Sequence, residues 1–282
     1  MDAVLLALGS ALLFGAMTIT LRGALRSGVP ADLVAFLMVL VAFGVALAAL
    51  PVTGWGGIAS CWPFLLAGLV APGASQIFFA LAVRDAGPAR ASVAVGTAPL
   101  VSVAIALTLL GEPAKPLLLL GAVAIVLGGV VLALEQGRPE HVRTVGLVFA
   151  LATMVLFATR DSLIRRLSLD TDIDAAVAAA ATLGSGSLVI LLSLLVARRP
   201  VSLRPLVPVL PTGITYGLSY VLLFEAFYRG RVSVVSPLIA TESLWTVVLA
   251  LLFLRGHEHV GRRLVLGALL VVAGGVVIGI VR

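Results

Sequence analysis

The sequence contains little charge and a single cysteine. Only 11% of its 282 residues are Asp, Glu, Lys or Arg, against the roughly 25% typical of soluble domains, while 61% are hydrophobic. The mean hydropathy is +1.20. Because a soluble fold cannot bury that much apolar surface, this composition excludes an ordinary soluble domain and indicates lipid as the solvent. Cys61 has no second cysteine to pair with, which excludes an intrachain disulfide.

Motifs for catalysis, metals and nucleotides are absent as well. The spacing of the three histidines fits no zinc motif, and the chain contains no GxSxG or HExxH pattern and no phosphate-binding loop. We therefore expect no enzyme, no cofactor, no metal site and no direct use of ATP. The net charge of +6 comes from Lys and Arg residues that lie singly or in pairs between apolar runs. That spread favours an anionic membrane surface over nucleic acid as the partner.

Ten apolar segments fill most of the chain. Each is close to the ~20 residues that a membrane-spanning helix needs, and none alternates as a barrel strand does. The pattern predicts an all-α integral membrane protein with ten transmembrane helices, multi-pass in the cell membrane. Asp2 replaces the basic start of a signal peptide, so we expect the first segment to be retained. The segments are Ala3 to Leu21, Leu33 to Leu50, Pro63 to Val83, Ala91 to Leu110, Leu117 to Leu134, Val145 to Leu163, Ala175 to Ala197, Leu206 to Phe227, Val232 to Leu254 and Leu264 to Val281.

The second half of the sequence repeats the first at a spacing near 144 residues. With five segments in each half, the second copy enters the membrane in the opposite orientation, as in secondary carriers that bind substrate between their halves. We predict two inverted five-helix repeats, residues 1–137 and 138–282. Matched pairs include Phe14 with Phe157 and Arg22 with Arg165 at an offset of 143, Gly73 with Gly217 and Ser92 with Ser236 at 144, and Glu112 with Glu258, Gly121 with Gly267, Gly128 with Gly274 and Gly129 with Gly275 at 146.

These motifs resemble the EamA-type ten-helix members of the drug/metabolite transporter superfamily. The resemblance rests on the glycine-glutamate at Glu112, the glycine-rich helix that follows it and the second copy of both, and it covers nearly the whole chain. The family's proline in the fourth span matches Pro99, but Ser243 occupies the corresponding place in the second half. The resemblance implies a carrier of small organic metabolites, usually outward, with both termini in the cytoplasm. Twelve arginines in the loops opposite the termini, against six basic residues on the termini side, instead predict termini outside.

Glu242 is the first candidate for chemistry. An ionisable side chain at membrane depth is costly, and Glu242 lies near the middle of the ninth segment, five residues after a helix-interrupting Pro237. It would bind a substrate amine or carry a proton during transport. The alternatives are a buried pair with an arginine such as Arg160, or a protonated side chain that only donates a hydrogen bond.

Arg160 and Asp161 interrupt the sixth segment, where the first has Met17 and Thr18. Arg160 could bind a substrate carboxylate, but both residues are about one turn from the segment's end and could equally extend to the membrane interface. Further candidates are polar or aromatic residues inside the third, eighth and ninth segments. They would either line a cavity or only pack between helices. They are Ser75, Gln76, Tyr216, Tyr220 and Trp245. Positions predicted to break helices or allow close packing are Pro72, Pro99, Pro237, Gly128, Gly129, Gly274 and Gly275.

Among function classes, a secondary transporter explains most of these features. It accounts for the duplicated halves, the carboxylate at membrane depth and the absence of a soluble domain, with alternating access between the two repeats. We predict an exporter of a small organic metabolite such as an amino acid or a derivative, with protons as a candidate coupling ion through Glu242. A non-transporting receptor or scaffold is the alternative, and an intramembrane enzyme is less favoured. The sequence specifies neither the substrate nor the oligomeric state.

Overall fold

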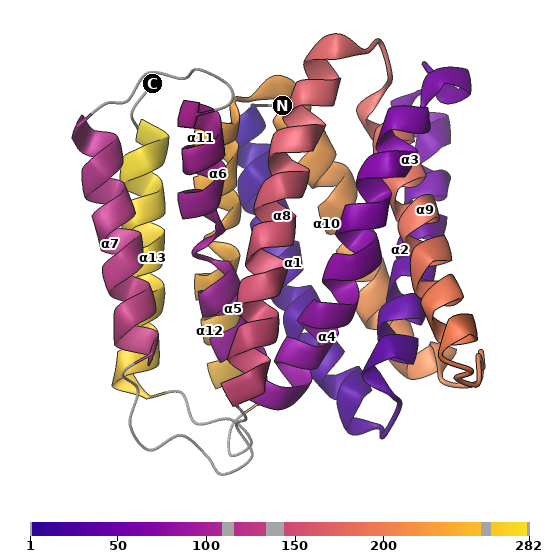
Figure 1. The fold of residues 1–282 in the computed structure, drawn as a ribbon, viewed down its shortest axis with the longest axis horizontal. Helices are drawn as coiled ribbons and strands as arrows, with labels where there is room; N and C mark the ends of the chain where they lie inside the picture. Colours follow the sequence, from indigo (N-terminus) through magenta and orange to yellow (C-terminus); the bar gives the residue numbers. More distant parts are fainter. Residues whose placement is uncertain (1, 109–115, 134–143, 255–260, 281–282) are drawn as a thin grey trace.

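Helices make up all of the regular structure in the computed structural model, which describes residues 2–108, 116–133, 144–254 and 261–280 (Figure 1). The all-helical prediction is therefore confirmed for this part of the chain. Glu112, Glu258 and the three histidines lie outside it. In chain order the elements are α1 (Ala3–Arg26), α2 (Ala31–Thr53), the 3-10 turn η1 (Ile58–Ser60), α3 (Trp62–Gly68), the π-helical turn η2 (Leu69–Ala74), α4 (Ser75–Ala86), α5 (Pro88–Val95), α6 (Ala98–Thr108), α7 (Pro116–Ala133), α8 (Thr144–Asp170), α9 (Ala175–Val196), α10 (Leu206–Arg229), α11 (Val232–Ile239), α12 (Glu242–Phe253) and α13 (Arg262–Ile280).

Six helices in the described ranges are long and apolar enough to cross a membrane. They are α1, α2, the continuous run of α3 to α4, α8, α9 and α10. Each coincides with one of the ten apolar segments in the sequence. The other four segments fall on α5 with α6, on α7, on α11 with α12 and on α13.

Two of the apolar segments are broken near their middle, each close to a proline, Pro99 or Pro237. The first ends α5 at Val95 and begins α6 at Ala98, and the second ends α11 at Ile239 and begins α12 at Glu242. At each break the backbone tightens into a turn with hydrogen bonds between residues three apart, such as Thr241 N to Leu238 O at 3.2 Å. Hydropathy alone does not locate the breaks, because the residues around them are as apolar as those of a continuous span.

Prolines occupy different places at the two breaks. Pro99 is the second residue of α6, where the missing N–H costs no helical hydrogen bond. Pro237 lies inside α11, before the second break. Ser243 is the second residue of α12, so this helix begins without a proline, and its N–H reaches back to Ala240 O at 3.2 Å.

The predicted irregularity at Pro72 is a turn between α3 and α4. Ala71 is extended, with φ −146° and ψ 120°, inside the π-helical turn Leu69–Ala74. The corresponding helix α10 is continuous, and its Gly213 and Gly217 instead let α2 approach closely. A Cβ at Gly217 would lie 2.7 Å from the Cβ of Val45.

Helices α7 and α13 form a pair at one edge of the bundle and cross at glycines (Figure 1). A Cβ at Gly128 would lie 2.7 Å from the carbonyl oxygen of Gly267, and one at Gly274 would lie 2.5 Å from that of Gly121. Contacts this close are the usual role of small residues between membrane helices. Gly275 is buried in α13, and the surroundings of Gly129 lie outside the described part.

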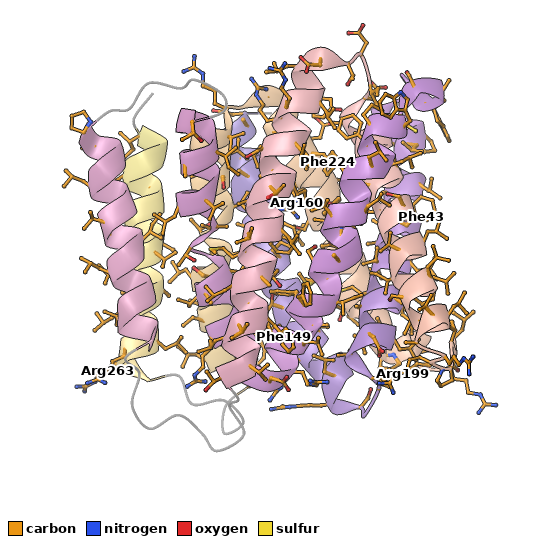
Figure 2. All side chains as sticks on the ribbon, viewed as in Figure 1. Phe43, Phe149, Arg160, Arg199, Phe224 and Arg263 are labelled. Atoms are coloured by element: carbon orange, nitrogen blue, oxygen red, sulfur yellow. The ribbon has the colours of Figure 1, made fainter. Side chains whose placement is uncertain are left out.

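The ends of the described chain and the labelled arginines give the bundle two distinguishable ends. Helix α1 begins and α13 ends at the upper end in Figure 1. Arg199 and Arg263 extend outward at the lower end, whereas Arg160 lies inside the bundle (Figure 2). Which end faces the cytoplasm stays a prediction.

Candidate functional site

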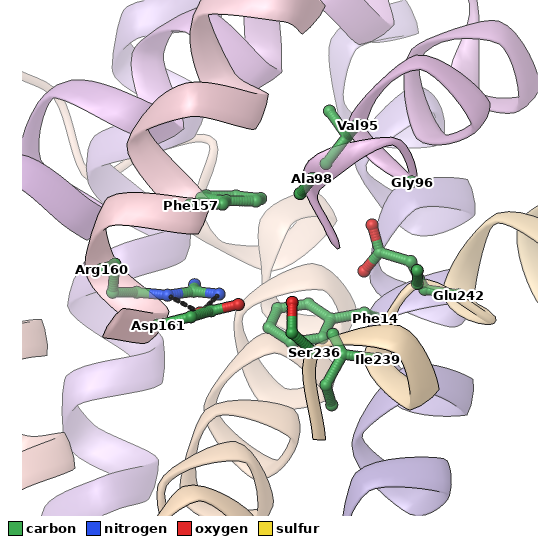
Figure 3. Close-up of a pocket in the computed structure, with 11 residues that line it drawn as sticks. Phe14, Val95, Gly96, Ala98, Phe157, Arg160, Asp161, Ser236, Ile239 and Glu242 are labelled. Carbon is green, nitrogen blue, oxygen red and sulfur yellow. Dashed lines mark hydrogen bonds and ion pairs between the residues drawn. The ribbon is translucent and has the colours of Figure 1, made fainter. Parts of the chain in front are cut away.

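A cavity lies where the two broken helices meet α1 and α8 (Figure 3). It contains about 340 Å³ of space between atoms, of which the centre of a water molecule can reach only about 20 Å³. That is room for about one water molecule, so this conformation is too closed for a metabolite. The lining residues are Phe14 from α1, Val95, Gly96 and Ala98 at the first break, Phe157, Arg160 and Asp161 from α8, and Ser236, Ile239, Ala240 and Glu242 at the second break.

Most of this lining consists of positions that correspond between the two halves of the sequence. Phe14 corresponds to Phe157 at an offset of 143, and three further pairs correspond at 144. These are Val95 with Ile239, Gly96 with Ala240, and Ala98 with Glu242. The cavity therefore brings together matched positions from both halves, while its charged groups all come from the second half.

Arg160 and Asp161 form an ion pair inside the bundle. The guanidinium donates to Asp161 Oδ1 from Nε at 2.9 Å and from Nη2 at 2.7 Å, and the two residues are only 2% and 3% exposed. They do not extend to the membrane interface. The ring centroids of Phe157 and Tyr220 lie 4.5 Å and 5.5 Å from the Arg160 guanidinium carbon. The Ser236 hydroxyl also bonds to the Asp161 carboxylate, which joins α8 to α11.

One guanidinium nitrogen of Arg160 takes no part in this ion pair. Arg160 Nη1 is buried and has no hydrogen-bond partner among the described groups. Adjacent residues on a helix point about 100° apart, so two neighbours do not ordinarily face the same space. Both nevertheless line the cavity, since the long arginine side chain folds back onto its neighbour.

Glu242 faces the cavity from the first residue of α12 (Figure 3). It is 6% exposed, and within the described ranges its carboxylate has no hydrogen-bond or ion-pair partner. The sequence left open a pair with Arg160, but that guanidinium bonds to Asp161 instead. The N-terminal end of α12 carries a partial positive charge that favours a carboxylate at this position.

Polar side chains from α4 and α10 lie next to the cavity. Gln76 Nε2 donates to the Tyr216 hydroxyl at 2.8 Å, and the ring of Tyr216 is 5.8 Å from that of Phe14 in the cavity wall. The Tyr220 hydroxyl donates to the carbonyl of Ala71 at 3.1 Å, inside the irregular turn η2. The hydroxyl of Ser75 and the amide oxygen of Gln76 are buried with no partner among the described groups.

Trp245 lies apart from the other candidates. Its side chain is 38% exposed, it does not line the cavity, and its Cβ packs where Gly15 of α1 leaves room. The apolar lining could not be recognised from residue type, because Phe14, Val95 and Ile239 look like ordinary packing residues in the sequence. The repeat was the signal that could have found them, since they occupy matched positions close to Glu242.

The arrangement offers one unpaired carboxylate and one partly satisfied guanidinium between aromatic and aliphatic walls. Within the described ranges no group of three His, Cys, Asp or Glu residues could hold a metal. A bundle of membrane-length helices around a buried polar cavity defines a polytopic membrane protein of the transporter class. The chain belongs to the EamA-like transporter family, whose model matches residues 1–134 and again residues 144–280.

Solved structures agree with the fold. Twenty-two chains match this one. One of them, described only as a crystal structure of a protein, covers 98% of this chain with 95% of its own length, at a TM-score of 0.70 and 23% identity. At that identity the likeness shows the fold alone. No curated protein matches the chain.

The family match confirms the resemblance seen in the sequence. The protein is a multi-pass membrane protein of the drug/metabolite transporter type, surrounded by lipid and acting on a small molecule.

Proposed function

We propose that this protein is a secondary transporter of the plasma membrane that exports a small organic metabolite such as an amino acid or a derivative. It has ten transmembrane helices in two inverted five-helix repeats, residues 1–137 and 138–282, and the substrate site is the cavity between them. The observation that carries the proposal is the meeting of two broken helices at a cavity lined by matched positions of the two halves.

The packing of the helices supports the inverted repeat. Helix α1 packs against α10 as its counterpart α8 packs against α4, and α1 packs against α12 as α8 packs against α6. Helix α2 packs against its own counterpart α9, and α7 packs against α13. For these helix pairs, exchanging the two halves leaves the neighbours unchanged, as a twofold relation requires.

The size of the cavity supports alternating access. A cavity that admits about one water molecule is closed to a metabolite, so binding requires α1, α8 and the broken helices to move apart. The breaks at residues 96–97 and 240–241 give each broken helix a point at which its two parts can shift separately.

The charged groups of the cavity support the proposal that the substrate carries an amine. Asp161 neutralises Arg160, so the Glu242 carboxylate is the uncompensated group of the cavity. An amine of the substrate, or a proton, would compensate it. The free Arg160 Nη1 would receive the carboxylate of an amino acid. Competition between a proton and an amine for Glu242 would couple export to the proton gradient.

Transport into proteoliposomes tests this function. The purified protein is reconstituted, and uptake of a panel of labelled amino acids and their amides is followed with and without a pH gradient. We expect uptake of at least one compound that depends on the gradient. Glu242→Gln should remove that dependence, whereas Glu225→Gln, on α10 and paired with Arg229, should retain it. Uptake of no compound would favour a receptor or scaffold, and equal pH dependence in Glu242→Gln would contradict the role of this residue.

A further inference from the structure

A second and larger hollow lies on the outer side of the bundle, away from the central cavity. It contains about 510 Å³ of space between atoms, of which the centre of a water-sized sphere can reach about 210 Å³. Its walls come from α2, η1, α3 and α9. The residues are Phe43, Leu47, Leu50, Ile58, Cys61, Leu65, Val177, Ala180, Ala181, Gly184 and Ser185.

The hollow exists because helix α9 has small residues on this side. Ala180, Ala181 and Gly184 are the sixth, seventh and tenth residues of α9. The same positions of α2, counted from its first residue, are Phe36, Leu37 and Leu40. Side chains of that size on α9 would fill the space between α2 and α3.

The chemistry of the walls decides what can occupy the space. None of the described residues that line the hollow is charged, and the Ser185 hydroxyl already donates to the carbonyl of Thr182 at 3.2 Å. Water would therefore find few partners, and an empty space of this size would forfeit packing contacts. Leu47, Ile58 and Leu65 are 42%, 54% and 40% exposed, so the hollow is continuous with the outer surface of helices that cross the membrane. Lipid hydrocarbon is the material in contact with that surface.

Two tryptophans mark the depth of the hollow in the membrane. Trp55 and Trp62 are 55% and 64% exposed and lie in or next to the α2–α3 connection, at the upper end of the bundle (Figure 1). Exposed tryptophan is typical of the membrane interface. The connection is held by Asp174, which accepts a hydrogen bond from Gly56 N at 2.7 Å and donates from its own N–H to Gly56 O at 3.1 Å.

From this geometry we infer that the hollow binds one acyl chain of a membrane phospholipid, from the leaflet on the side where α1 begins. The headgroup lies at the level of Trp55 and Trp62, and the chain extends down between Leu47 of α2 and Leu65 of α3, over the small residues of α9. This lipid site is separate from the central cavity and does not depend on the transported substrate.

Photochemical cross-linking in bilayers tests the site. The protein is reconstituted with a phosphatidylcholine that carries a diazirine on one acyl chain, and adducts are mapped by mass spectrometry. We expect adducts on Leu47, Leu65 and Val177 to exceed severalfold those on Leu66 and Leu188, which are 55% and 54% exposed outside the hollow. Adducts distributed in proportion to exposure would overturn the proposal, and this wild-type result needs no variant.

A matched pair of variants provides a second test. Ala181→Leu fills the hollow and should lower the adducts on Leu47 and Leu65 severalfold. Leu188→Phe adds volume to the same helix outside the hollow and should leave them unchanged. If Ala181→Leu folds and retains the wild-type adducts, the acyl chain is not in the hollow. Equal losses in both variants would also reject the site, since the effect would then be general to α9.

Discussion

Arg22 and Arg165, which are 143 residues apart in the sequence, make the same contact at opposite ends of the helix bundle. Nη1 of Arg22 donates to the carbonyls of Val83 and Arg84 at 3.0 and 2.8 Å, at the end of α4. Nη1 of Arg165 donates to the carbonyls of Phe227 and Tyr228 at 3.0 and 3.3 Å, at the end of α10. Each arginine thus donates to carbonyls in the last turn of a helix, where intrahelical partners run out; the Val83 carbonyl also accepts from Gly87 N at 3.1 Å.

Replacing either arginine by alanine should destabilise the protein. The last carbonyls of α4 or α10 lose a charged donor, and such a hydrogen bond is worth about 1–2 kcal/mol at a partly exposed site. We expect Arg22→Ala and Arg165→Ala to lower the thermal unfolding midpoint in detergent by similar amounts. Arg26→Ala, an exposed arginine one turn further along α1, is the control and should change little. A large effect in only one of the two would show that their roles differ.

Asp161→Asn should lower the stability of the protein more than the loss of the whole ion pair does. Removing one partner leaves the Arg160 charge buried without compensation, which typically costs about 3–5 kcal/mol. The double variant Arg160→Met with Asp161→Thr installs the residues found at the matched positions Met17 and Thr18, both 1% exposed. It should recover most of the stability and still fail to transport. Recovery of transport along with stability would show that the pair has only a structural role.

The sequence predicted the fold class well because membrane helices depend on long apolar runs, which composition shows directly. It placed Glu242 near the middle of an apolar segment, but it left open whether Arg160 and Asp161, about one turn from the end of theirs, extend to the membrane interface. Pro99 and Pro237 pointed to interruptions in these two segments, but the boundaries before Ala98 and Glu242 could not be located, because hydropathy does not change there. The partner of Arg160 could not be predicted either, since rotamers and packing decide whether its side chain turns toward Asp161 or Glu242.

Replacing glycine by alanine at two positions should distinguish the effect of close helix packing on stability from the effect of helix propensity. Gly128→Ala places a methyl group 2.7 Å from the carbonyl oxygen of Gly267, and we expect a loss of about 1–3 kcal/mol from overpacking. Gly44→Ala, in α2, adds a methyl group that has no atom of the described residues within 4 Å beyond its own stretch of helix. It should be neutral or stabilise by up to about 1 kcal/mol, as alanine does in a helix. Thermal unfolding in detergent measures both, and equal effects would show that α7 and α13 do not depend on this crossing.

Moving the carboxylate of Glu242 to its matched position provides a test of the twofold relation at the cavity. Ala98 is the first residue of α6 as Glu242 is of α12, and both line the cavity. Glu242→Ala should lower transport by about tenfold or more, because a lost charged contact is worth roughly 1.5–3 kcal/mol. Adding Ala98→Glu returns a carboxylate to the same space from the other half, and we expect part of the pH-dependent uptake to return. Ala94→Glu in the same background, one turn earlier and outside the cavity lining, is the control and should restore none. If both double variants fold and neither regains uptake, the site depends on the position of Glu242 in the second half and not only on a carboxylate in the cavity.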